Sequence, residues 1–109
     1  MNMTLYMAQR LSAMVMGPLV LGHLAVMVYA IEGGLSTAEI LGRTKGSIWW
    51  FLFYGSFVVA ASIHGAIGLR AIIGESLGLR GRLLSLLAWG FGILTLMLGA
   101  RAVMAVTLL

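Results

Sequence analysis

The sequence predicts an all-α integral membrane protein in which three helices cross the bilayer and the N-terminus lies in the cytoplasm. Hydrophobic residues make up 61% of the 109-residue chain and charged residues only 9%, whereas a soluble domain carries about 25% charged residues. The apolar residues form three long runs, each near the roughly 20 residues that span a bilayer. The basic residues gather beside particular ends of these runs, which gives the orientation.

The three predicted spans belong to one transmembrane domain, residues 1–109. The first covers residues 11–31 and is closed by the sequence EGG. The second covers residues 47–73 and opens with the aromatic sequence WWFLFY, and the third, residues 83–108, follows the sequence RGR. Because a segment in lipid must satisfy its own backbone hydrogen bonds, each span is expected to be a helix.

Positive charge is distributed unevenly between the two sides of the membrane. Four arginines fall on one side, and two basic residues diluted by two glutamates fall on the other: Arg10, Arg70, Arg80 and Arg82 against Arg43, Lys45, Glu32 and Glu39. The positive-inside rule therefore places the N-terminus and the second connection in the cytoplasm, and predicts a multi-pass protein of the inner (cytoplasmic) membrane. Scattered charges of this kind do not form a nucleic-acid-binding face, so lipid and not nucleic acid is the expected surrounding.

Two histidines and an arginine, His23, His64 and Arg101, lie within the predicted spans, besides Arg70 at the cytoplasmic boundary of the second span. A buried polar group costs several kcal/mol without a partner, so such residues in a membrane point to function. Neutral imidazole is a good ligand for haem iron. No carboxylate lies inside a predicted span, which disfavours a proton relay, and the absence of cysteine excludes thiolate-held zinc and iron–sulfur clusters on this chain.

His64 has small residues on its own helix face. Ala60 and Ala61 precede it by one turn and Gly68 follows by one turn, which clears a flat strip beside the imidazole. A porphyrin bound through His64 would need that clearance. The alternative is that the small residues serve helix packing and that His64 makes only a hydrogen bond between helices.

His23 and Arg101 allow two interpretations each. The face of His23 carries methionines, which suit either packing or a haem edge. Counted from the predicted helix ends at 1.5 Å per residue, His23 and His64 lie at similar depths, about 18 and roughly 14 Å from the cytoplasmic side. Arg101 lies near the outer end of its helix, where it either extends its guanidinium to the interface or pairs with a haem propionate.

Two motifs resemble a known family. The sequence QRLSAMVMGPLVLGHL, residues 9–24, resembles the Arg-x-Ser-Gly opening of the first helix in the cytochrome b membrane-anchor subunits of succinate dehydrogenase and fumarate reductase, complex II. The sequence HGAIGLRAIIGES, residues 64–76, resembles the His-x3-Gly-(Ile/Leu)-Arg segment of the same family. Chain length and the three-span topology agree with this resemblance.

The resemblance implies the cofactor and the binding residues. It implies that His64 is an axial ligand of haem b, beside Gly68, and that His23 is a second ligand in two-haem members. Quinone would be bound near the cytoplasmic face by Tyr6, Arg10 and Ser12.

The resemblance also implies the partners. They are a flavoprotein subunit, which carries out the dicarboxylate step of the tricarboxylic acid cycle, an iron–sulfur subunit, and a second small membrane anchor. This chain would supply no catalytic residue for the dicarboxylate and would lie on the electron path to quinone. Two alternatives stay open: a haem-free anchor of such a complex, and a small oligomeric membrane transporter.

Overall fold

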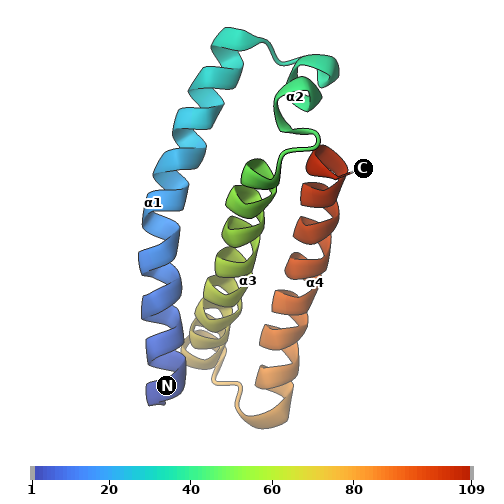
Figure 1. Cartoon of the computed structure of the whole chain (residues 1–109). Helices are drawn as coiled ribbons and strands as arrows, with labels where there is room; N and C mark the ends of the chain where they lie inside the picture. Colours follow the sequence, from blue (N-terminus) through green and yellow to red (C-terminus); the bar gives the residue numbers. More distant parts are fainter. Residues whose placement is uncertain (1, 109) are drawn as a thin grey trace.

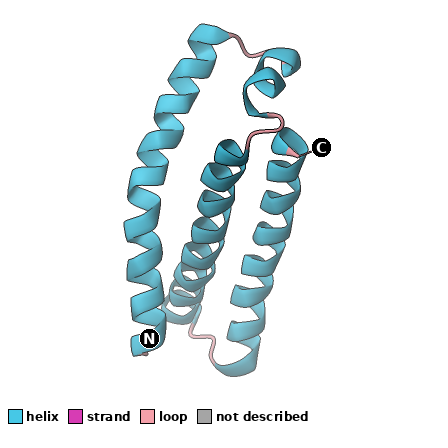
Figure 2. Cartoon of the chain, in the orientation of Figure 1, coloured by secondary structure: helices cyan, strands magenta, loops and turns pink. Residues whose placement is uncertain are grey.

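Four helices make up nearly all of the computed structural model, which describes residues 2–108 (Figure 1). Their bounds are α1 (Met3–Gly33), α2 (Thr37–Thr44), α3 (Ile48–Leu77) and α4 (Gly81–Thr107). Short loops join them, and the described residues contain no strand (Figure 2). Three of the helices, α1, α3 and α4, are long and apolar enough to cross a membrane. The all-α fold with three membrane-spanning helices is therefore confirmed.

The long helices run side by side, with α3 packed against both α1 and α4 (Figure 1). The molecule is 47 Å long, which matches the roughly 40–45 Å of a bilayer with its headgroup regions. The N-terminus and the α3–α4 loop lie at one end, and α2 and the C-terminus lie at the other. The expected connectivity of three spans thus appears as an antiparallel arrangement of neighbouring helices.

Glycines on α4 bring its backbone close to α3. A Cβ atom added at Gly92 would lie 2.8 Å from the Cβ of Ala66, and one added at Gly99 would lie 2.5 Å from Cγ1 of Val58. Side chains larger than hydrogen have no room at either place. In lipid, where apolar contact between helices brings no hydrophobic gain, such close packing is a main source of helix association.

Buried side chains are concentrated between α3 and α4. The buried apolar residues are Ala60, Ala66, Ile67, Leu84, Ala88 and Val103. On α1, by contrast, Ser12 is the one buried residue among those described. Most of the apolar surface of α1 therefore faces outward, toward lipid or another chain.

The loop after the first span contains a helix, α2, that hydropathy alone did not predict. Its first turn is closed by a capping box, in which Ser36 Oγ accepts from the Glu39 amide at 3.2 Å and Glu39 Oε2 accepts from the Ser36 amide at 3.2 Å. The signal in the sequence was the Ser-x-x-Glu spacing, which is typical of a helix N-terminus.

The end of α2 is attached to the end of α4. The Thr44 hydroxyl donates to the backbone oxygen of Val106 at 2.6 Å, and the Gly46 amide donates to that of Thr107 at 2.6 Å. The last carbonyl groups of a helix have no partner within it. These two bonds satisfy two of them where the loop crosses the end of the bundle.

Candidate functional site

His64 on α3 faces α1 at Ser12. The Ser12 Oγ atom lies 3.3 Å from His64 Nδ1 and 2.9 Å from the backbone oxygen of Gln9. Ser12 is 7% exposed, and His64 is half-buried. The sequence pattern singled out both residues, and the structure brings them into contact across the α1–α3 interface.

Gln9 covers the small residue that follows His64. A Cβ atom at Gly68 would lie 3.5 Å from Gln9 Nε2, so this part of the predicted small-residue strip lies against α1. The other polar atom of the amide, Gln9 Oε1, is buried without a hydrogen-bond partner among residues 2–108. The sequence interpretation did not select Gln9. The sequence feature that could have indicated Gln9 is its spacing of three residues from Ser12, because residues three apart lie next to each other on one helix face.

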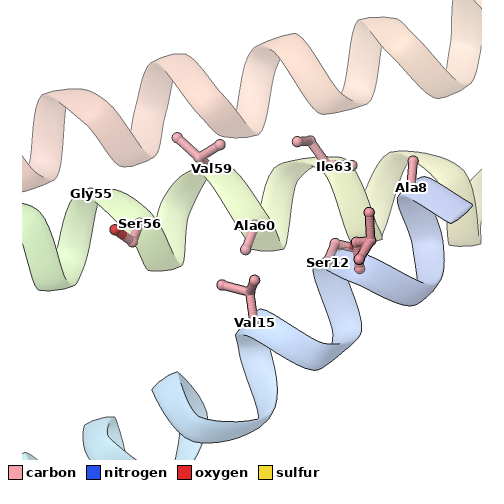
Figure 3. Close-up of a pocket in the computed structure, with 9 residues that line it drawn as sticks. Ala8, Ser12, Val15, Gly55, Ser56, Val59, Ala60 and Ile63 are labelled. Atoms are coloured by element: carbon pink, nitrogen blue, oxygen red, sulfur yellow. The ribbon is translucent and has the colours of Figure 1, made fainter.

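A groove of about 530 Å³ runs along the same helix pair. It is lined by Ala8, Leu11, Ser12, Val15, Gly55, Ser56, Val59, Ala60 and Ile63. In Figure 3, Ser12 and Val15 of α1 and Ala60 of α3 point into the space between the two helices. Two serine hydroxyls are the polar side-chain groups of this lining. The groove is therefore suited to an apolar chain or ring that makes few hydrogen bonds.

His23 lies in a different part of the α1–α3 interface. Its ring centroid is 5.5 Å from that of Phe57 and 6.3 Å from that of Tyr54. These aromatic residues precede His64 by seven and ten positions, or about 10 to 15 Å along the helix. Because two axial ligands must flank a single iron atom closely, His23 and His64 do not share one iron in this arrangement.

The expectation of similar depths for the two histidines is corrected by this placement. Helix α1 begins at Met3, eight residues before the predicted span at residue 11. His23 consequently lies about 30 Å from the start of α1, whereas His64 lies about 20 Å from the end of α3. The membrane-spanning length of α1 was recognised from the sequence, but its helical extension before Leu11 was not.

The three residues expected to bind quinone do not lie together. Tyr6 and Arg10 are exposed on α1, one turn apart, and Ser12 is buried against α3. At 100° per residue, Ser12 projects about 200° around the helix from Arg10. The structure therefore separates an outward pair, Tyr6 and Arg10, from an inward residue, Ser12.

Arg101 is exposed on α4. Gly92 packs against Ala66 near the level of His64. Arg101 lies nine residues after Gly92, or about 13 Å further along α4. Its guanidinium is thus attached to a helix on the other side of α3 and nearer to the C-terminal end of the bundle. It is not brought to His64.

The chemistry around His64 fits a haem iron better than a bare metal ion. No group of three or more His, Cys, Asp or Glu side chains within residues 2–108 could hold an ion. A porphyrin supplies four of the ligands itself and needs only axial imidazole from the protein. His64 Nδ1 is in contact with Ser12, and for Nε2 the structure shows no hydrogen bond among the described residues. His64 could hold such a group, although Gln9 covers the neighbouring Gly68.

Comparison with known proteins gives one family. No curated protein and no solved structure matched the chain. Residues 1–100 match the family model described as succinate dehydrogenase/fumarate reductase transmembrane subunit. The match covers all of α1, α2 and α3 and most of α4. Of the residues considered above, it leaves out Arg101, Val103, Val106 and Thr107. The chain therefore belongs to the succinate dehydrogenase/fumarate reductase transmembrane subunit family.

Proposed function

We propose that this chain is a haem b-binding membrane anchor that passes electrons between a partner iron–sulfur subunit and membrane quinone. The observation that carries the proposal is the environment of His64, an intramembrane imidazole with a hydroxyl at Nδ1. Family membership implies catalytic partner subunits outside this chain and gives no support to the transporter alternative. The dicarboxylate chemistry belongs to a flavoprotein partner.

In this proposal His64 would hold the haem through its Nε2 atom. Haem b, when bound, accepts and releases one electron at a time. His23, on α1, packs beside Phe57 and Tyr54, about 10 to 15 Å along the bundle from His64, so a second iron ligand would come from a second small anchor chain. Arg101 would pair with a haem propionate only if a second group were held at the level of His23.

Tyr6 and Arg10 are the proposed quinone contacts on this chain. Both are exposed on α1 near the N-terminal end of the bundle, where a partner subunit can complete a site around them. The Arg10 guanidinium would stabilise the partly anionic reduced quinone, and the Tyr6 hydroxyl would donate a hydrogen bond to its oxygen. We place this end in the cytoplasm because Arg10, Arg70, Arg80 and Arg82 gather there.

A haem-free anchor of the same complex is the second candidate. It is favoured by the contact of Gly68 with Gln9, through which α1 occupies part of the strip beside His64. In that case the His64–Ser12 contact would serve helix packing, and lipid or quinone would fill the groove between α1 and α3.

The test is a reduced-minus-oxidised spectrum of the intact complex, purified through a tag on this chain. We expect a b-type band in the unmutated complex and its loss in His64→Ala. The matched control is Ile72→Ala, an exposed residue of the same helix, which should leave the band intact. An unmutated complex that contains flavin and iron–sulfur subunits but has no b-type band would establish the haem-free anchor instead.

A second variant counts the haems. In His23→Phe an aromatic side chain keeps the packing against Phe57 and Tyr54. An unchanged haem-to-protein ratio would assign the opposite axial ligand to a partner chain, as proposed. Loss of half the haem would show a second group held by His23.

A further inference from the structure

We propose that Ser12 is a positioning residue for His64, which fixes the imidazole as the tautomer protonated on Nδ1 and leaves Nε2 free to bind iron. This inference rests on the proposed haem function and deepens it. It also gives Ser12 a role different from the quinone contact that the family resemblance implies.

The Ser12 hydroxyl has a single hydrogen to donate. Two acceptors compete for it: the backbone oxygen of Gln9 at 2.9 Å and His64 Nδ1 at 3.3 Å. The first is the shorter and lies within the same helix, three residues back, where serine hydroxyls commonly bond the backbone. The hydrogen therefore belongs to the bond with Gln9.

In the contact between Ser12 and His64, the histidine must then be the donor and the serine the acceptor. With its hydrogen directed at Gln9, Ser12 Oγ presents a lone pair to Nδ1. A neutral imidazole carries one proton on one of its two nitrogens. That proton lies on Nδ1, which donates to Oγ, so the lone pair available for a metal lies on Nε2.

Burial makes the arrangement specific. Ser12 is 7% exposed and is the buried residue of α1, so water does not readily replace its hydroxyl. An unsatisfied buried donor costs about 1–3 kcal/mol. The tautomer and the ring orientation of His64 are consequently both fixed by one side chain. Groups that orient ligating histidines in this way change metal affinity by about 10–100-fold when they are removed.

The sharpest comparison uses three variants of the intact complex. Ser12→Ala removes the hydroxyl, and Ser12→Thr keeps it. Ser85→Ala removes a half-buried hydroxyl from α4, away from the groove, where it makes no side-chain hydrogen bond among the described residues. Haem affinity, the midpoint potential of the b-type band and the low-spin electron paramagnetic resonance signal are measured for each.

We expect Ser12→Ala to weaken haem binding about 10–100-fold and to raise the midpoint potential, because an imidazole that no longer donates from Nδ1 stabilises ferric iron less well. Ser12→Thr should keep both values, and Ser85→Ala should match the unmutated complex. Haem affinity, potential and resonance signal that are all unchanged in Ser12→Ala would overturn the proposal while leaving haem ligation by His64 intact.

A second measurement needs no haem. The full chain is labelled with 15N in its histidine rings and reconstituted in lipid without haem, with His23→Phe used to leave His64 as the single signal. We expect the neutral tautomer with the proton on Nδ1, and a change in its population in Ser12→Ala. A proton on Nε2 in the unmutated site would overturn the inference, whether or not the complex contains haem.

Discussion

Gln9 carries a buried polar atom that no other described residue of the chain satisfies. Its Oε1 atom is buried and has no hydrogen-bond partner within residues 2–108, although its backbone oxygen accepts from Ser12. A buried acceptor without a partner costs about 1–3 kcal/mol. This unfavourable burial lies at the polar part of the α1–α3 interface, where the Gln9 side chain contacts α3 one turn away from His64.

We expect Gln9→Met to stabilise the isolated chain by about 1 kcal/mol, because methionine fills a similar volume without a polar atom. The measurement is the thermal unfolding of the detergent-solubilised chain. Gln9→Glu is the opposing variant and should lower the unfolding temperature, since it buries a charge in the same place. A lower unfolding temperature for Gln9→Met would mean that Oε1 has a partner in the free chain.

From the sequence, helix geometry predicts which residues share a face of one helix, but not which residues of different helices meet. Helical spacing alone places Tyr6 and Arg10 on one face and Ser12 on another. It does not say which face meets α3, so the contact between Ser12 and His64 could not be predicted. The same limit applies to Gly68, whose missing side chain leaves space that Gln9 takes up.

At the scale of elements, the α3–α4 pair depends on two glycines that lie one above the other on α4. Gly92 and Gly99 are seven residues apart and both approach α3 closely. Gly90, on the same helix, has nothing within 4 Å of an added Cβ atom. The sequence indicated that glycines would offer close-approach surfaces, and the structure shows which of them do so within this chain.

Gly99→Val is expected to destabilise the α3–α4 pair by about 1–3 kcal/mol, because the new side chain overlaps Val58. Gly90→Val changes helix propensity in the same way without that overlap. The difference in unfolding temperature between the two variants in detergent isolates the packing effect. Equal unfolding temperatures would show that the close approach at Gly99 contributes nothing.

The start of α4 breaks a local preference. Arg80 is its N-cap and makes no side-chain capping bond, and the first turn has no acidic residue. Arginines next to a helix N-terminus oppose the helix dipole. Arg80 and Arg82 therefore do not serve helix stability, and their position agrees with a topological role at the membrane surface.

At the scale of the whole molecule, the described helices expose far more apolar surface than they bury. In the most apolar stretch of α1 no residue is buried, and in those of α3 and α4 the buried share is 22% and 17%. Hydropathy was sufficient to predict the three spans. It could not predict their packing, because a span that is apolar on all sides has no distinct face for the sequence pattern to mark.

We expect the tagged chain, purified from its native membrane in mild detergent, to bring down a flavoprotein, an iron–sulfur protein and one further small membrane protein. The reason is the family of the chain together with the exposed face of α1. The measurement is mass spectrometry of the purified complex with flavin and iron assays. A homo-oligomer free of flavin and iron would contradict the assignment of partners.

The groove between α1 and α3 cannot stand empty in a bilayer. Acyl chains reach it as readily as any partner and are just as apolar as its walls, so expelling them yields no transfer free energy. A ring or a helix that replaces these acyl chains must bind more tightly than they do, through its fit to the groove and through hydrogen bonds to the few polar atoms there. Assembly of this subunit therefore requires that lipid be displaced from the groove, and the assembly equilibrium depends on the acyl composition of the surrounding membrane.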